Sequence, residues 1–209
     1  MSYLDLKLFK PFGPSVAKVT IPENIVNELN KYTDQVIKDS DKSKDLNYGN
    51  KLVGHVKQEF KMEKEFMVKS GWFKFLANGV KNWIQESHNK TVSNFNLINS
   101  WIVRQYENEY NPTHFHGGHV SGVGYLKVPD DLGGSVQQAG KKNNYNGKLE
   151  LIHGSKMFLC DPQFRIKPKV GDFYFFPHYL MHTVYPFKGP GERRSVSFNA
   201  TVDEKTFNS

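Results

Sequence analysis

The sequence predicts a protein of the α+β class that is mainly β, with helices in its N-terminal part and a β-core after them. Apolar residues recur at helical spacing only before about residue 90, and short β-rich runs alternate with Gly, Pro and Asn from about residue 95. A length of 209 residues suits one domain, and 16 Phe, 10 Tyr and 3 Trp supply bulky core side chains. We expect a single domain over residues 1–209, in which residues 1–90 support a core formed by residues 91–203.

The N-terminal part reads as an extended segment followed by two helices. Residues 3–21 show the alternation of apolar and polar residues that is typical of strands. Pro22 and Glu23 form a favourable helix start, and this helix is expected to end near Ser40. Its apolar stripe consists of Ile25, Val26, Leu29, Tyr32, Val36 and Ile37. A second stripe predicts a helix over residues 64–88 and consists of Trp72, Phe75, Leu76, Val80, Trp83 and Ile84.

The β-core is predicted from seven short runs that favour strands. These runs cover residues 96–106, 119–128, 148–153, 164–167, 173–176, 182–186 and 194–202. Several short strands with turn residues between them indicate a β-sandwich or barrel. The segment from Asp130 to Gly147 is rich in Gly, Asn and Lys, and we expect a long mobile loop there.

Composition excludes several classes of protein. No apolar run approaches the roughly 18 residues that a membrane span needs. The N-terminus lacks the continuous apolar run of a signal peptide, and Cys160 is the only cysteine, so no intrachain disulfide can form. These observations favour a cytoplasmic setting, which for a viral protein would be the cytoplasm of the host.

The formal net charge of +7 raises the question of a nucleic-acid partner. Only four of the 28 basic residues are arginines, although nucleic-acid sites draw heavily on arginine for bidentate contacts. The lysines are spread along the chain, and Lys141-Lys142 is the densest pair in a polar loop. We interpret the charge as that of a solvated surface, which disfavours a nucleic-acid partner.

Three of the eight histidines lie close together, at His114, His116 and His119. Side chains at positions i and i+2 of an extended chain lie on the same face, so His114 and His116 can converge on one point while Phe115 turns away. Two converging imidazoles suit a transition metal such as iron, copper or zinc. A His-x-His pattern alone is a weak signal, because surface histidines often have this spacing.

A second cluster follows in the C-terminal third. Gly171-Asp172 predicts a turn, Phe173–Phe176 an apolar strand that Pro177 ends, and His182 opens the next run. After a Gly-Pro-Gly turn, alternation along the last strand separates two faces. One face carries Arg193, Ser195, Ser197 and Asn199, and the other carries Arg194, Val196 and Phe198. A polar stripe that contains an arginine is typical of an anion pocket, although an edge strand with a solvated face would show the same pattern.

This order of segments resembles the iron(II)- and 2-oxoglutarate-dependent oxygenases. It is most similar to the branch found in marine bacteria and their tailed phages, which is related to the prolyl hydroxylases. The resemblance covers about residues 99–202. Its motifs are the His-x-His strand, Ser121-Gly122-Val123-Gly124-Tyr125-Leu126, Gly-Asp-x-x-x-Phe-Pro, His182 and Arg193-x-Ser195.

The resemblance implies a double-stranded β-helix core, the jelly roll of cupin-like proteins, with supporting helices from the N-terminal part. It implies that His114 and His182 bind iron(II) as the first and last ligands. His116 takes the position of the middle ligand, which in this family is normally Asp or Glu. Three interpretations remain open: His116 is the third ligand, another residue supplies a carboxylate, or the site is impaired. His119 is a spare candidate.

The resemblance also implies the cosubstrate contacts. Arg193 would pair with the distal carboxylate of 2-oxoglutarate, helped by the Ser195 hydroxyl, and Tyr125 and Asn199 are further candidates. Ascorbate would be a stimulant, as for related hydroxylases. We expect apolar walls such as Phe175 and Val184 to shield the reacting groups.

The activity implied is hydroxylation of a C–H bond, with succinate and CO2 as coproducts. A peptide or protein substrate is the first expectation, with a proline side chain as the first candidate, and a small molecule is the second. We expect the Asp130 to Gly147 loop and the polar 40–60 region to cover the substrate. Two other classes remain as alternatives: a three-histidine cupin-type metal enzyme that does not use 2-oxoglutarate, and a non-enzymatic jelly-roll binding or structural module.

Overall fold

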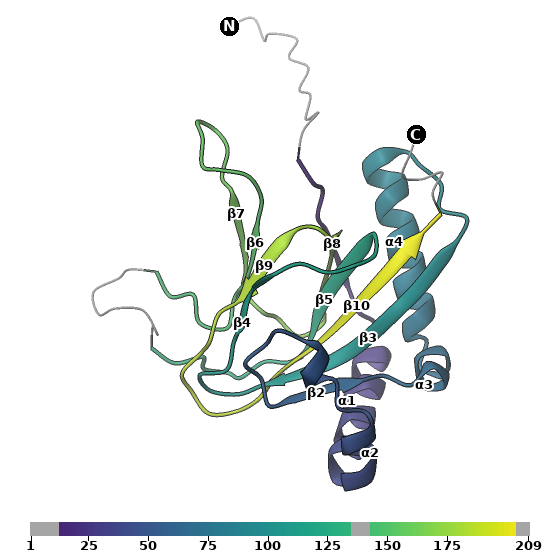
Figure 1. Ribbon diagram of the computed structural model, residues 1–209, viewed down its shortest axis with the longest axis vertical. Coiled ribbons are helices and arrows are strands. Elements are labelled where there is room, and N and C mark those ends of the chain that lie inside the picture. The colour runs from purple at the N-terminus through teal and green to yellow at the C-terminus, as the bar shows by residue number, and fades with distance from the viewer. Residues whose placement is uncertain (1–12, 135–142, 204–209) are drawn as a thin grey trace, which may run out of the picture.

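Two antiparallel β-sheets form the centre of the molecule (Figure 1). The structure is a computed structural model and describes residues 13–134 and 143–203. The larger sheet has the strand order β1-β8-β5-β10-β3-β2, and the smaller sheet has the order β4-β9-β6-β7. The strands are β1 Ala17–Thr20, β2 Gln58–Lys61, β3 Phe95–Gln105, β4 Asn111–His114, β5 Val120–Lys127, β6 Leu149–Ile152, β7 Gln163–Ile166, β8 Asp172–Pro177, β9 Met181–Val184 and β10 Arg193–Val202.

All seven predicted β-runs are strands, with boundaries that differ by at most two residues from the expected ones. One further strand was not predicted: β2, which follows a polar region and pairs with β3. The expected His-x-His strand is β4, but it ends at His114, so His116 lies beyond it.

The helices lie in the N-terminal part, as the sequence predicts. They are α1 Glu23–Lys38, α2 Ser40–Asp45, α3 Lys64–Lys69 and α4 Trp72–His88, with a 3-10 turn at Gly49–Lys51. Helix α2 was not expected, and it forms because the Asp39 carboxylate accepts hydrogen bonds from the backbone N–H groups of Asp41 and Lys42. The predicted helix over residues 64–88 is divided by Gly71, whose positive φ of 79° ends the helical path after α3.

Helices α1 and α4 pack against the outer face of the larger sheet and bury their apolar stripes there (Figure 1). The outward residues of β8 and β10, among them Phe173, Phe175 and Phe198, meet these stripes in one core. Gly79 in α4 lies directly on the Phe175 ring, at a distance that leaves no room for a β-carbon. A smaller core between the two sheets contains Tyr125, Leu149 and Phe176. No helix in the described parts of the chain has the length and apolar character to cross a membrane.

Candidate metal and cosubstrate site

His114, His116 and His182 lie together between the two sheets. His114 ends β4 and pairs directly with His182 of β9, which places the two rings side by side with centroids 4.2 Å apart. His116 follows two residues after β4, and its Nε2 lies 3.1 Å from Nε2 of His182. One ring nitrogen from each of the three histidines lies within 4.8 Å of the others. This spacing allows one metal ion to contact all three.

The orientation of two of these rings is fixed by backbone carbonyl groups. Nδ1 of His114 lies 2.7 Å from the Pro112 oxygen, and Nδ1 of His182 lies 2.8 Å from the Leu180 oxygen. A carbonyl oxygen can only accept, so the proton of each neutral ring is on Nδ1 and the lone pair is on Nε2. Metal-bound histidines are commonly held in this way.

The protonation states also suit a metal. Burial lowers the pKa of His114. Burial, with neighbouring histidines as the second cause, lowers the pKa of His116 to about 3 and that of His182 to about 4. The three rings are therefore neutral near pH 7, and neutral imidazole is the form that binds metal. A set of three neutral nitrogen donors fits a first-row transition metal, iron(II) included.

Two buried carboxylates of the β-core, Glu150 and Asp172, have partners away from the histidine cluster. Glu150 is paired with Arg165 and accepts a hydrogen bond from the Tyr185 hydroxyl. Asp172 lies 2.7 Å from the ammonium of Lys18. Within the described residues the cluster consists of histidines alone. His119 is outside it, and its Nδ1 accepts a hydrogen bond from the Val202 backbone N–H at 3.1 Å.

A narrow cavity between the sheets joins this cluster to the predicted anion-binding face of β10. Its walls are Trp101, Val103, Gln105, Asn111, His116, Gly122, Val123, Leu149, Phe176, His182, Val184, Arg193, Ser195 and Ser197. The predicted alternation of β10 is confirmed, because Arg193, Ser195 and Ser197 line the cavity while Val196 and Phe198 belong to the helix-side core.

Phe175 does not line the cavity, contrary to expectation. It packs on the helix side against Phe75 and Trp83 of α4, whereas its neighbour Phe176 forms the cavity wall. Strand β8 is apolar on both faces because helices cover one and the smaller sheet covers the other, so alternation could not assign the faces. Val184 lines the cavity as expected.

Arg193 carries a buried group that lacks a partner. The residue is 1% exposed; its Nε donates to the Gly147 carbonyl at 3.1 Å and its Nη1 donates to Gln105 Oε1 at 3.0 Å. Its Nη2 has no hydrogen-bond partner among the described residues. Buried polar atoms are nearly always satisfied, so an unpaired guanidinium nitrogen beside a cavity marks a place for an anionic ligand.

Tyr125 and Asn199 occupy different surroundings. The guanidinium of Arg193 lies 5.0 Å above the Tyr125 ring, and the Tyr125 hydroxyl lacks a partner within the described part of the chain. Burial raises the pKa of Tyr125 to about 12, so its hydroxyl stays a hydrogen-bond donor. Asn199 Oδ1 accepts a hydrogen bond from Ser121 Oγ at 2.8 Å, and Asn199 is not among the cavity walls.

Two residues of β3 belong to the site and were not predicted. Gln105 accepts a hydrogen bond from Arg193, and the rings of Trp101 and His116 form an edge-to-face pair with centroids 5.6 Å apart. Their alternation along β3 was visible in the sequence. The pairing of β3 with β10, which places Gln105 opposite Arg193, was not.

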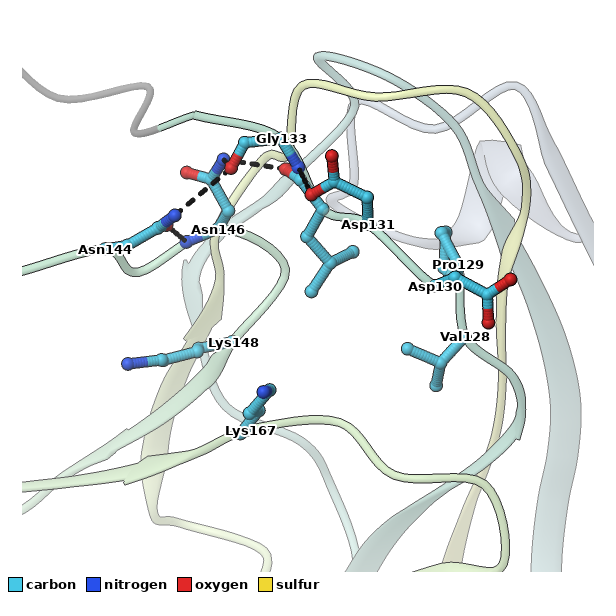
Figure 2. A pocket seen from close by; sticks show the side chains of 10 residues that line it. Val128, Pro129, Asp130, Asp131, Gly133, Asn144, Asn146, Lys148 and Lys167 are labelled. Carbon is cyan, nitrogen blue, oxygen red and sulfur yellow. Dashed lines mark hydrogen bonds between the residues drawn. The ribbon is translucent and has the colours of Figure 1, made fainter.

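The described ends of the loop between β5 and β6 meet beside Arg193. Nδ2 of Asn146 donates to the carbonyl groups of Leu132 and Gly133 at 2.8 and 3.2 Å (Figure 2). It also donates to the Gly134 carbonyl at 2.7 Å. These ends, with Lys148 and Lys167, line a separate cavity of about 320 Å³. Residues 135–142 of the predicted loop, including Lys141-Lys142, lie outside the described residues.

Comparison with known families decides the identity of the β-core. Residues 99–199 match the family model described as "Putative 2OG-Fe(II) oxygenase". This part of the chain belongs to the 2OG-Fe(II) oxygenases. Iron(II) and 2-oxoglutarate are therefore its cofactors, and the enzymatic class predicted from the sequence is confirmed. No curated protein matches the sequence.

Solved structures of oxygenases share the fold. A prolyl-4-hydroxylase from Pseudomonas putida is similar at 14% identity and a TM-score of 0.55, over 88% of this chain and 91% of that chain. A prolyl hydroxylase from Trichoplax adhaerens, in complex with a peptide fragment of the hypoxia inducible factor, is 11% identical with a TM-score of 0.56, over 93% and 87%. HygX from Streptomyces hygroscopicus, with nickel, 2-oxoglutarate and hygromycin B bound, is 10% identical with a TM-score of 0.57, over 88% and 82%. The predicted jelly-roll fold is confirmed by these likenesses; an origin in marine bacteria or phages stays a prediction.

Proposed function

We propose that this oxygenase hydroxylates a C–H bond of a peptide, protein or small-molecule substrate, with succinate and CO2 as coproducts. In this proposal His114, His116 and His182 hold the iron(II), and Arg193 binds the distal carboxylate of 2-oxoglutarate. The observation that carries it is the unpaired Nη2 of Arg193 in a cavity that also contains His116 and His182. Dioxygen is the oxidant: one of its oxygen atoms goes into the new hydroxyl group and the other into succinate. Bound iron(II) and 2-oxoglutarate would supply the chemistry that activates dioxygen, which the protein does not provide by itself.

The protein's part is to bind and orient. Gln105 and the Gly147 carbonyl fix two nitrogens of the Arg193 guanidinium, so the third is presented to the carboxylate without loss of side-chain freedom on binding. The Ser195 hydroxyl lies on the same wall and can donate a second hydrogen bond. The cavity measures about 40 Å³, so the cosubstrate enters with a rearrangement of side chains.

Charge balance is consistent with His116 as the third ligand. Replacing the usual carboxylate by neutral imidazole leaves the metal site one positive charge higher. The dianionic cosubstrate offsets this charge when it binds. The apolar side chains of Leu149, Phe176 and Val184 line the same cavity and exclude water from it.

For the substrate, we propose a peptide or protein first, with a proline side chain as the leading candidate, and a small molecule second. The solved oxygenases of similar fold include one in complex with a peptide and one with hygromycin B bound, so fold alone does not separate the two classes. Ascorbate stays a predicted stimulant.

The experiment is anaerobic reconstitution of the protein with iron(II), followed by 2-oxoglutarate and then oxygen. We expect 2-oxoglutarate to change the absorption spectrum of the iron(II) protein and oxygen to yield succinate. A spectrum that 2-oxoglutarate leaves unchanged, together with no succinate, contradicts the proposal and favours a cupin-type enzyme or a binding module.

A further inference from the structure

Glu59 in β2 is a buried carboxylate without a partner. It is 1% exposed, and neither of its side-chain oxygens has a hydrogen-bond partner among the described residues. Other buried carboxylates here are satisfied: Glu150 by Arg165, and Glu109 by the backbone N–H groups of Lys57 and Tyr106. Burial of an unpaired carboxylate is among the most unfavourable arrangements in a protein interior, so Glu59 requires an explanation.

The strand register places Glu59 next to the active-site cavity. Glu59 pairs directly with Val103, and Val103 pairs with Ser195 on the other side, so the three side chains form one row on the inner face of the sheet. Val103 and Ser195 line the cavity with His116 and His182. Adjacent strands are about 4.8 Å apart, so Glu59 lies roughly 10 Å from Ser195, on the side away from the 2-oxoglutarate clamp.

A larger cavity lies against the same region. It measures about 410 Å³ and lies between residues 54–57 and residues 106–109, with Glu107 and Glu109 in its wall. Gln105 and Asn111, which flank residues 106–109, line the inner cavity. The residues that line the two cavities are therefore neighbours along the chain at both ends of this turn. The wall also contains His55 and Lys57, so its two glutamates face one lysine and one histidine.

The lysines nearest to Glu59 in the sequence form no ion pair with it. Lys57 and Lys61 stand two positions to either side of it, and both are exposed. The ammonium of Lys61 lies 6.0 Å above the Tyr48 ring. Burial, with the charge of Glu109 as the second cause, raises the pKa of Glu59 to about 7. The carboxyl group is therefore ready to ionise when a cation approaches.

We propose that Glu59 recognises the substrate of this oxygenase by binding a positively charged nitrogen group, an ammonium or a guanidinium. Such a group offers several N–H donors together with a positive charge, which is what two unpaired carboxylate oxygens require. A neutral donor would leave the buried charge uncompensated. This inference rests on the proposed function and adds to it that the substrate is cationic near the C–H bond that is oxidised.

The test uses iron-free protein and two small probes of the same shape, butylammonium chloride and 1-butanol. Binding to the wild type, Glu59→Gln and Glu65→Gln is followed by protein NMR titration at constant ionic strength. Glu65 is an exposed glutamate in α3, so its variant controls for the loss of one negative charge. We expect the wild type and Glu65→Gln to bind butylammonium at least ten-fold more tightly than Glu59→Gln, and the three proteins to bind butanol alike.

Equal butylammonium affinity in the wild type and Glu59→Gln overturns the inference, as does a wild type that does not prefer butylammonium to butanol. Either result leaves the oxygenase proposal standing, because iron and 2-oxoglutarate are not used. Conversely, succinate formation can fail while the cation site is retained. Should Glu59→Gln not fold, Glu59→Asp replaces it. The shortened carboxylate should bind more weakly yet still prefer the cation, and an unchanged affinity counts against the inference.

Discussion

Arg193 and Arg194 are neighbours in β10 and serve opposite faces of the same sheet. Each is 1% exposed. The guanidinium of Arg193 faces the inter-sheet cavity and keeps one nitrogen unpaired, whereas Arg194 donates to Asp34 of α1 at 2.7 Å and to Glu192 at 2.6 Å. Two buried arginines of one strand thus face different surroundings, one the inter-sheet cavity and the other the helix layer.

This pair provides a matched test of the cosubstrate clamp. We expect Arg193→Ala to weaken 2-oxoglutarate binding by about 10- to 100-fold, because charge-assisted hydrogen bonds contribute about 1.5–3 kcal/mol. The affinity is measured by calorimetric titration of the anaerobic iron(II) protein with 2-oxoglutarate. Arg194→Lys is the control, which should lower the melting temperature while the affinity for 2-oxoglutarate stays the same. Equal losses of affinity in both variants would contradict a clamp formed by Arg193.

The role of His116 can be tested by two substitutions at one position. His116→Asp restores the usual donor set of two histidines and a carboxylate, and we expect it to bind iron(II) stoichiometrically. His116→Ala and His182→Ala should bind much less iron, as measured by metal analysis after anaerobic dialysis. His153→Ala, a change at an exposed histidine, serves as the control. Full iron content in His116→Ala would show that His116 is not a ligand.

The lowered pKa of Glu192 leads us to expect that the protein loses stability in acid. Hydrogen bonds from Arg104 and Arg194 hold the pKa of Glu192 at about 2, below its ordinary value of 4.5. A lowered carboxyl pKa stabilises the fold above the unfolded value, and this stabilisation is lost as the pH falls from about 5 to 2. It corresponds to about 3 kcal/mol. Urea unfolding of the wild type and Glu192→Gln should therefore show a difference at pH 6 that narrows towards pH 3; a constant difference would argue against the ion pairs.

From the raised pKa of Glu59 we expect the opposite dependence of stability on pH, a loss of stability as the pH rises. Its pKa is raised from 4.5 to about 7, so the folded protein keeps a proton that the unfolded chain has released. The free energy of unfolding then falls as the pH rises from about 4.5 to 7, by about 3 kcal/mol, and stays low above. We expect Glu59→Gln to remove this fall and to be more stable than the wild type at pH 8. Parallel stability profiles for the two proteins from pH 5 to pH 8 would mean that the carboxylate is not buried as described.

Much of the site was accessible to sequence reasoning because it lies on strands of regular alternation. Side chains two positions apart on an extended chain lie on the same face. This rule predicts both the inward-facing residues of β10 and the convergence of His114 and His116. Residues that depend on strand pairing were not accessible. Gln105 reaches Arg193, and Glu59 comes to lie beside Val103, only through the strand order β10-β3-β2. The wrong assignment of Phe175 has a similar origin, since a strand covered on both sides has no polar face to mark its orientation.

The contact between Gly79 and Phe175 sets the depth at which α4 rests on the sheet. A methyl group there would have to lift the helix or turn the ring, and Phe175 is bonded to Phe176, whose side chain forms a wall of the inner cavity. A close-packed interior has little free space, so a displacement of one side chain also shifts the side chains next to it. We therefore expect that selection for a different substrate preference would yield two groups of substitutions. One group would lie in the cavity, and the other would lie at the buried contact between α4 and the larger sheet, remote from the metal site.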